Sequence, residues 1–230
     1  MSSAPTSGRA PEPAPSPRAD AWDRARVAAA FGLPADTMAR LDAYVALLER
    51  WQARVNLIGP ATVGDIWGRH IADSLQLIAL APADARVWLD LGSGAGLPGL
   101  VLAIALAGRP GFAMHLVEAN ARKCAFLAIA GAAAGVPVTV HRARIEALGR
   151  EAGHPRPEII CARALAPLSE LLPLARPFMW KRTVLLLHKG QDVERELTEA
   201  TISRKLTIER RASVVDPAAT ILRIREASDR

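Results

Sequence analysis

The chain has few aromatic residues, little cysteine and no long apolar run. Of its 230 residues only four are Phe, five Trp and one Tyr, although half are hydrophobic, so the apolar part is mostly aliphatic. Cys124 and Cys161 lack Cys-x-x-Cys spacing, which argues against a disulfide framework or a zinc site. The longest apolar stretch, Gly92–Ala107, is shorter than the roughly 20 residues of a membrane span. The first residues lack the apolar segment of a secretory signal. We expect a cytoplasmic protein without metal or membrane helix.

Lysine is scarce as well. Only Lys123, Lys181, Lys189 and Lys205 occur among 29 cationic residues, and the net charge is +6. Arginine in place of lysine, together with abundant alanine, also accompanies GC-rich coding sequence, so the choice of cation says little about function. The positive balance itself favours a polyanionic partner such as nucleic acid.

The first part of the chain divides into a tail and a helical region. Five of the 17 prolines fall within residues 1–20, and this stretch has too few apolar residues to offset the entropy of ordering, so we expect a disordered tail. Apolar residues at helical spacing predict a helix over 36–51, and a second helix is expected over 66–75 after the break at Gly59-Pro60. We assign residues 21–82 to this helical region.

Residues 83–230 alternate between short β-rich runs and helical stretches. Such alternation predicts a mainly parallel sheet covered by helices on both faces, an α/β architecture of the Rossmann-like type. The last two runs are joined by a segment too short for a crossover helix, so we expect an antiparallel hairpin at one edge. The predicted strands are 86–91, 112–117, 136–141, 157–162, 183–188, 205–210 and 220–225.

A glycine-rich turn follows the first predicted strand. The dinucleotide fingerprint Gly-x-Gly-x-x-Gly is formally matched over residues 94–99, so nicotinamide chemistry is one hypothesis. The spacing of Asp90 with Gly92, Gly94 and Gly96 fits better with a zwitterionic, sulfonium-bearing ligand. The strand-end carboxylate would attract the positive groups of such a ligand, whereas it would repel a pyrophosphate. The glycines would let the backbone approach that ligand closely.

Further polar residues follow the next two strands. Glu118 ends the second strand, where an acid can accept hydrogen bonds from both hydroxyls of an adenosyl ribose. Ile145 and Glu146 follow the third strand, where a backbone N–H and a carboxylate could contact the adenine edge. Because the carboxyl ends of parallel strands lie at one edge of a sheet, these residues are expected to border one ligand crevice.

The sequence resembles the RsmG family, also called the glucose-inhibited division protein B family, over roughly residues 36–225. The resemblance rests on five ordered motifs. They are Trp51–Ile58, Arg69–Leu75, Asp90–Gly99, Arg163–Ala166 and His188–Gly190. The usual Asn-Leu-Thr is Asn56-Leu57-Ile58 here, and Glu118 stands where some members carry Asp.

This resemblance implies a class I methyltransferase fold with an added N-terminal helical region and S-adenosylmethionine as cofactor. It implies a substrate guanine in the 530 loop of 16S ribosomal RNA, methylated at N7. It also implies that the cofactor is bound by Gly92, Leu97, Ile145, Glu146 and Arg163. Guanine N7 carries a lone pair and no proton, so no general base is expected, in agreement with the absence of an Asp/Asn-Pro-Pro-Tyr/Phe motif after the fourth strand. We expect a monomer that acts on the small ribosomal subunit or its precursor.

Two cations at strand ends are positioning candidates. Arg163 follows the fourth strand, and we expect it to hold the methionine carboxylate or an RNA phosphate, with a structural pair to an acid such as Glu170 as the alternative. Lys189 follows the fifth strand before Gly190, and we expect it to contact an RNA phosphate, with a solvated loop lysine as the alternative.

Other RNA-contact candidates are expected near the same edge. His70 and Asp73 share one helix face, where the acid could orient the imidazole or the two could simply brace the helix on the sheet. The remaining candidates are Arg122, Lys123 and Arg144.

Three other functions stay open. A nicotinamide-dependent oxidoreductase is disfavoured by Asp90 and by the lack of a Tyr-x-x-x-Lys pair, since Tyr44 is the single tyrosine. A methyltransferase acting on another RNA site or on a small molecule, and an RNA-binding module without catalysis, remain to be tested by methyl transfer.

Overall fold

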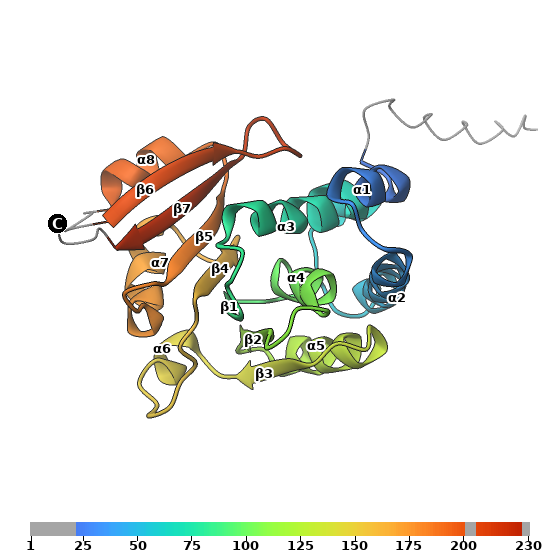
Figure 1. Cartoon of the computed structure of the whole chain (residues 1–230), viewed down its shortest axis with the longest axis horizontal. Helices are drawn as coiled ribbons and strands as arrows, with labels where there is room; N and C mark the ends of the chain where they lie inside the picture. The colour runs from blue at the N-terminus through green and yellow to red at the C-terminus, as the bar shows by residue number, and fades with distance from the viewer. Residues whose placement is uncertain (1–21, 201–205, 227–230) are drawn as a thin grey trace, which may run out of the picture.

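The protein is built around one twisted sheet with helices on both faces (Figure 1). The computed structural model describes residues 22–200 and 206–226. The predicted disordered tail at 1–20 lies outside the described residues.

The sheet has seven strands in the order β3-β2-β1-β4-β5-β7-β6. All neighbouring pairs are parallel except β5 with β7 and β7 with β6. The predicted strands and terminal hairpin are therefore confirmed, with β7 inserted between β5 and the edge strand. Their bounds are β1 (Val87–Leu91), β2 (Ala113–Glu118), β3 (Val138–Arg142), β4 (Ile159–Arg163), β5 (Val184–Lys189), β6 (Leu206–Ala212) and β7 (Thr220–Glu226).

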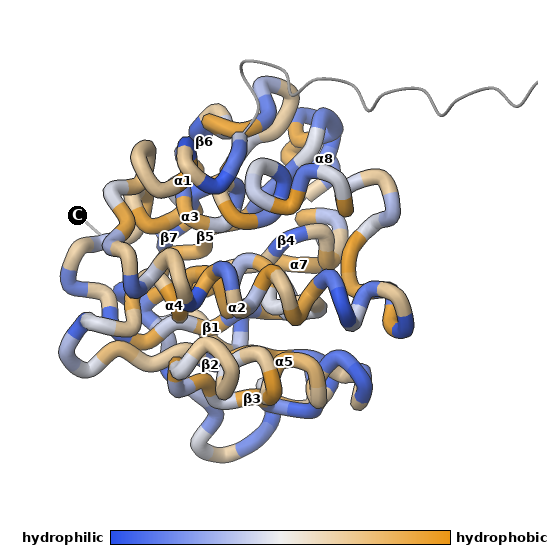
Figure 2. Tube along the Cα trace, turned by 90° about the vertical axis from the view of Figure 1, so that its right-hand side faces the viewer, coloured by the Kyte–Doolittle hydropathy of each residue, from blue (hydrophilic) through white to orange (hydrophobic). Residues whose placement is uncertain are grey.

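On one side of the sheet lie α4 (Gly99–Leu106) and α5 (Ala121–Ala133). Outside them, α2 (Ala35–Gln52) packs on α4 and α5, and α1 (Arg24–Phe31) packs on the segment 67–72. Leu41 of α2, Leu100 of α4 and Trp88 of β1 belong to one continuous apolar cluster. Nearly every residue of α4 is buried, and Figure 2 shows this helix in hydrophobic colours beside α2. The N-terminal helices thus share a core with the sheet. The domain boundaries at 21–82 and 83–230 stay a prediction.

The predicted helix at 36–51 corresponds to α2, but α1 was not anticipated. This helix has eight residues, begins after the N-cap Asp23 and ends at Gly32, whose φ is +59°. The expected second helix at 66–75 is part of a longer irregular helical segment. It consists of the 3₁₀ turn η1 (Pro60–Asp65), the π-helical η2 (Trp67–Ala72), α3 (Asp73–Leu75) and the 3₁₀ turn η3 (Gln76–Leu80).

The opposite face carries α6 (Ile145–Leu148), α7 (Leu168–Ala175), the short η4 (Arg176–Phe178) and α8 (Val193–Glu199). Leu89 and Leu91 of β1 pack on this side with Leu168 of α7. Because successive side chains of a strand point to opposite faces, the apolar run of β1 supplies both clusters. No helix within the described part of the chain is long and apolar enough to span a bilayer.

Candidate active site

A pocket of about 710 Å³ opens at the carboxyl ends of β1, β4 and β5. Its walls come from the glycine loop after β1, the residues after β4 and β5, and the N-terminal segment 57–73. Ligand pockets commonly enclose roughly 300–1,000 Å³, so this volume suits a small-molecule ligand. Gly92, Gly94, Leu97, Arg163, His70, Lys123 and Lys189 line it, as expected for residues of one crevice.

The glycine loop is held by backbone geometry and by the N-terminal helices. Gly92, Gly94 and Gly96 have φ values of +70°, +55° and +87°, a region that side-chain-bearing residues rarely adopt. A Cβ on Gly94 would meet open space, with only a backbone oxygen at 3.8 Å, so this part of the loop faces the pocket. The Tyr44 hydroxyl of α2 donates to the Ala95 carbonyl at 2.8 Å, which ties the loop to α2.

Gly96 and Asp90 serve the packing of the loop rather than the approach of a ligand. A Cβ on Gly96 would lie 2.7 Å from the Leu100 Cβ, so the expected close approach is to helix α4. Asp90 is fully buried and its Oδ2 accepts from the Gly99 N–H at 3.1 Å, at the start of α4. Burial raises the pKa of this carboxyl to about 6. The expectation that Asp90 faces the positive groups of a ligand is therefore corrected, because it points into the core.

Glu118 braces the glycine loop from β2. Its Oε2 accepts from the Gly94 N–H at 3.0 Å and its Oε1 from the Asn120 N–H at 2.7 Å. The side chain is partly exposed, and each carboxylate oxygen keeps lone pairs beyond these bonds. A ribose contact is thus compatible with its geometry and stays a prediction.

The expected adenine-side residues lie at the same sheet edge, after β3, which is two strands away from β1. Ile145 and Glu146 begin α6 after β3, with Ile145 buried and Glu146 exposed. Arg122 at the start of α5 and Arg144 before α6 are both exposed. None of these four is among the described residues that line the pocket, so their roles stay predictions.

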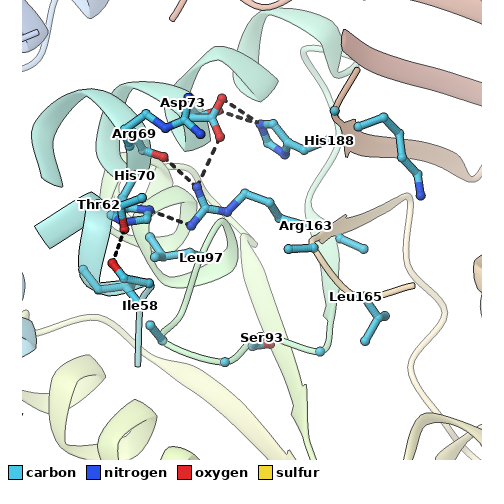
Figure 3. A pocket seen from close by; sticks show the side chains of 18 of the residues that line it. Ile58, Thr62, Arg69, His70, Asp73, Ser93, Leu97, Arg163, Leu165 and His188 are labelled. Atoms are coloured by element: carbon cyan, nitrogen blue, oxygen red, sulfur yellow. Dashed lines mark hydrogen bonds and ion pairs between the residues drawn. The ribbon is translucent and has the colours of Figure 1, made fainter. Parts of the chain in front are cut away.

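Arg163 joins the end of β4 to the N-terminal segment (Figure 3). Its Nη1 donates to the Arg69 carbonyl at 2.7 Å and to Asp73 Oδ2 at 3.2 Å. Its Nη2 donates to His70 Nδ1 at 2.7 Å. The acid that pairs with Arg163 is therefore Asp73, from a region far away in sequence, and the suggested partner Glu170 was wrong.

His70 and Asp73 do not orient each other directly; both contact Arg163 instead. His70 Nε2 meets the Thr62 hydroxyl at 2.9 Å, and the residue is only 5% exposed. Burial, followed by the Arg163 and Arg69 charges, lowers the pKa of His70 to about 3, so the ring is neutral. The expected RNA contact by His70 is not supported, because the ring is buried with both nitrogens engaged.

The Lys189 side chain is also buried and bonded to groups within the protein. Its Nζ donates to the Ala166 carbonyl at 2.8 Å and forms an ion pair with Glu196 Oε2 at 2.7 Å. The same Glu196 oxygen accepts from the Leu168 N–H at 2.7 Å, so the ion pair fixes the wall that follows β4. Only 6% of the Lys189 side chain is exposed. The expected phosphate contact by Lys189 is corrected to a scaffold role.

Three residues with a clear place at the site were not singled out from the sequence. They are Tyr44, Gln52 and His188. The Gln52 Oε1 accepts from the N–H groups of Leu57 and Ile58 at 2.9 Å, which shapes one wall of the pocket. Gln52 and His188 lie within two of the motifs that carry the family resemblance, which was the available signal. Tyr44 offered none beyond being the single tyrosine.

The structure offers no sign of a metal centre: among the described residues no group of three or more His, Cys, Asp or Glu side chains could hold an ion. Both cysteines are free and buried.

The sequence is similar to a family of known proteins. The family described as rRNA small subunit methyltransferase G matches residues 37–220. A ribosomal RNA small subunit methyltransferase G of Methylorubrum populi is 51% identical over 206 residues, which cover 89% of this chain and 96% of the relative. The protein of the same name from Parvibaculum lavamentivorans is 46% identical over 192 residues, with 83% of each chain covered.

Solved structures resemble the fold at low sequence identity. A ribosomal protein L11 methylase from Lactobacillus delbrueckii subsp. bulgaricus has a TM-score of 0.52 at 16% identity, covering 67% of this chain and 77% of its own. A mutant of MtNAS in complex with S-adenosylmethionine has a TM-score of 0.54 at 12% identity, covering 90% and 84%. These similarities confirm the Rossmann-like α/β fold.

Proposed function

Because the chain belongs to the family described as rRNA small subunit methyltransferase G, we propose that it methylates N7 of a guanine in the 530 loop of 16S ribosomal RNA. Membership makes the protein an S-adenosylmethionine-dependent methyltransferase of ribosomal RNA. The guanine base, its N7 atom and the 530 loop are the parts that we propose beyond family membership. The observation that carries the proposal is one pocket bordered both by the glycine loop and by the N-terminal segment 57–73.

The residues of the pocket fit the cofactor. Gly94 leaves open space above a loop that the Gly94–Glu118 and Ala95–Tyr44 hydrogen bonds hold in place. We propose that Gly92, Gly94 and Leu97 contact S-adenosylmethionine, with Glu118 at the ribose and with Ile145 and Glu146 on the adenine side. Gly96 and Asp90 would act by holding the loop. The cofactor supplies a methyl group on a cationic sulfonium, whose transfer to N7 requires no proton removal.

Arg163 is the proposed holder of the methionine carboxylate. Three of its N–H groups are used by Arg69, Asp73 and His70. A guanidinium has five donors, so two remain for a carboxylate or a phosphate. The internal bonds keep these donors in one orientation, which lowers the entropy lost on binding.

Three of the four Lys and Arg residues that line the pocket are paired with acids, and Lys123 is the fourth. Arg163 pairs with Asp73, Lys189 with Glu196, and Arg69 with Asp216. His70 and His188 are neutral because burial lowers both pKa values. A sulfonium and a base that becomes cationic on N7 methylation would be repelled by unpaired cations at short range. We propose that this pairing makes the pocket tolerant of positive charge, while alignment of the reactants supplies most of the catalysis.

The proposed RNA surface consists of the exposed Arg122 and Arg144 together with the half-buried Lys123, which lines the pocket. Arg122 and Lys123 begin α5, and Arg144 precedes α6, at neighbouring strand ends. Such cations can contact phosphates and give affinity that falls with salt. His70 and Lys189 are left out of this surface because they are buried.

The test is methyl transfer to small ribosomal subunits from a strain that lacks the modification. Labelled S-adenosylmethionine should place one methyl group on the RNA, and chemical cleavage at 7-methylguanosine should map it to the 530 loop. Label on another base, or on a metabolite pool with none on RNA, would contradict the proposal. Light scattering of the purified protein tests the further proposal that it is a monomer. Fractionation of cells tests the proposed cytoplasmic location.

A further inference from the structure

His188 is a buried histidine with a hydrogen-bonding atom left over. It lies at the end of β5 and lines the pocket, and 8% of its side chain is exposed. Its Nε2 lies 2.8 Å from the Asp73 carbonyl. Among the described residues, its Nδ1 is the buried side-chain nitrogen or oxygen without a partner. Figure 3 shows that this second ring nitrogen points away from Asp73.

The protonation pattern of the ring follows from its neighbour. A carbonyl oxygen only accepts, so Nε2 must carry the hydrogen. Burial lowers the pKa of His188, which keeps the ring neutral and leaves Nδ1 as a bare acceptor. A buried acceptor without a partner costs free energy, so such an atom on a residue that lines a ligand pocket calls for a donor from the ligand.

The strand order places this acceptor beyond the reacting end of the cofactor. Along the carboxyl edge, β2 carries Glu118, β1 the glycine loop, β4 Arg163 and β5 His188. Arg163 and His188 are register neighbours on adjacent strands, and strands lie about 4.8 Å apart. On the proposed function, Glu118 at β2 would hold the ribose, and Arg163 at β4 would hold the methionine carboxylate. The space next to β5 then belongs to the methyl acceptor.

Guanine presents matching chemistry on the side opposite to N7. N7 and O6 are acceptors, whereas the Watson–Crick edge carries the N1–H and N2–H donors. If N7 faces the methyl donor, the Watson–Crick edge faces away from it, and β5 would be the strand on that side. Leu57, Leu97 and Leu165 line the same pocket and offer apolar contacts to the faces of a planar base. A base unstacked from the RNA is needed for such contacts, as in sequence-specific recognition of RNA loops.

We propose that His188 reads the acceptor base: its Nδ1 accepts a hydrogen bond from the N1–H or N2–H of the guanine. This inference rests on the proposed function and adds the residue that selects guanine. Adenine carries an acceptor at N1 and would leave Nδ1 facing another lone pair. The Asp73–His188 hydrogen bond would hold the ring in the orientation required.

Two substitutions separate the two nitrogens of this ring. His188→Gln can place an amide N–H near the Nε2 position and keep the bond to the Asp73 carbonyl, but it lacks the acceptor at Nδ1. His188→Asn can place an amide oxygen near the Nδ1 position and loses the bond to Asp73. If His188 reads the base, Gln should lower kcat/KM for RNA methylation about tenfold or more, with Asn closer to the wild type. A purely structural role predicts the reverse order, and that result would overturn the inference.

The full-length proteins are then assayed on reconstituted small subunits that carry guanosine, inosine or 2-aminopurine at the target position. Inosine lacks the N2 amine, and 2-aminopurine lacks N1–H. The wild type should discriminate against at least one analogue, and that discrimination should shrink to about twofold in His188→Gln. Equal discrimination by both enzymes would overturn the assignment. Calorimetry should give unchanged S-adenosylmethionine affinity for His188→Gln, since a loss would mean that Nδ1 contacts the cofactor ammonium. If the wild type transfers no methyl group to guanine N7, the proposed function itself fails, which is a separate outcome.

Discussion

The hydroxyl of Tyr44 donates a 2.8 Å hydrogen bond to the carbonyl of Ala95, and both residues are buried. The two residues are 51 positions apart, in α2 and in the glycine loop. The N-terminal helical region therefore does more than cover the sheet, because it holds the loop that would receive the cofactor. Burial raises the pKa of the Tyr44 hydroxyl, so it stays protonated and available as a donor.

Replacing Tyr44 by Phe removes only this hydroxyl and leaves the Ala95 carbonyl without its donor. We expect a loss of about 1–2 kcal/mol in unfolding free energy, together with severalfold weaker S-adenosylmethionine binding, because the loop loses a buried tether. Urea denaturation and calorimetry measure the two effects. Unchanged cofactor affinity in a destabilised variant would show that the tether serves the fold alone.

Replacing Glu118 by Gln should weaken cofactor binding. The carboxylate accepts from the N–H groups of Gly94 and Asn120, and an amide can accept only at its oxygen. We expect S-adenosylmethionine affinity to fall by about 1–3 kcal/mol as the loop bond and the proposed ribose contact weaken. The matched control is Glu199→Gln, an exposed acid at the end of α8, which should bind the cofactor as the wild type does. Calorimetry that gives the same affinity for both variants would remove Glu118 from the ribose site.

The Lys189–Glu196 pair predicts a stability effect rather than an RNA effect. Lys189→Met leaves Glu196 and the Ala166 carbonyl without their shared donor, and breaking a buried ion pair in this way costs about 3–5 kcal/mol. The exposed Lys181, changed to Met, is the control and should alter stability by less than about 0.5 kcal/mol. Chemical denaturation of the two variants gives the comparison.

RNA binding provides the second arm of this test. The salt dependence of RNA affinity should be unchanged in Lys189→Met but shallower in Arg144→Ala, which removes an exposed cation from the proposed RNA surface. A shallower slope for folded Lys189→Met would restore Lys189 as a phosphate contact.

Asp90 predicts a pH-dependent penalty. Burial raises the pKa of its carboxyl from 3.8 to about 6, so the folded protein holds this proton to higher pH than the unfolded chain does. The contribution of this proton to the unfolding free energy of the wild type is therefore lost as pH rises from about 4 through 6, and none of it remains above that range. Asp90→Asn has no such titration. Between pH 5 and pH 8, the unfolding free energy of Asp90→Asn should therefore rise by about 1–2 kcal/mol relative to that of the wild type. A constant difference across this range would show that the carboxyl titrates normally.

Much of the fold was visible in local patterns. Short, nearly uncharged apolar runs such as 183–188 predict strands buried on both faces, and β5 is central and buried as expected. The final hairpin followed from a connection too short for a helix. What local pattern could not supply was α1, whose eight residues have little amphipathic character, and the irregular turns between Pro60 and Leu80, which depend on packing against α1 and α4.

Four of the nine residues expected to bind the cofactor line the described pocket, and the pairings of the charged groups were not predicted. Gly92, Gly94, Leu97 and Arg163 line one pocket, as the strand-end argument required. The partners of the charged groups were not predicted, because Arg163 and Asp73 are 90 positions apart and meet only when the N-terminal segment lies across the sheet edge. Lys189 was expected to contact RNA because a lysine before a glycine at a strand end is usually exposed. In the structure it is buried and forms an ion pair with Glu196 of α8.

The sequence by itself determined the α/β architecture, the strand ends that carry the glycine loop and Arg163, and the chemistry implied by the family resemblance. Spacing along the chain specifies elements and the edge at which they end, since those properties depend on neighbouring residues. Tertiary structure alone decided which acids pair with Arg69, Arg163 and Lys189 at the pocket and that Arg122 and Arg144 stay exposed. It also decided that, among the described residues, one nitrogen of His188 has no partner. The physical reason is that pairing and burial are set by contacts between distant segments, which no local pattern encodes.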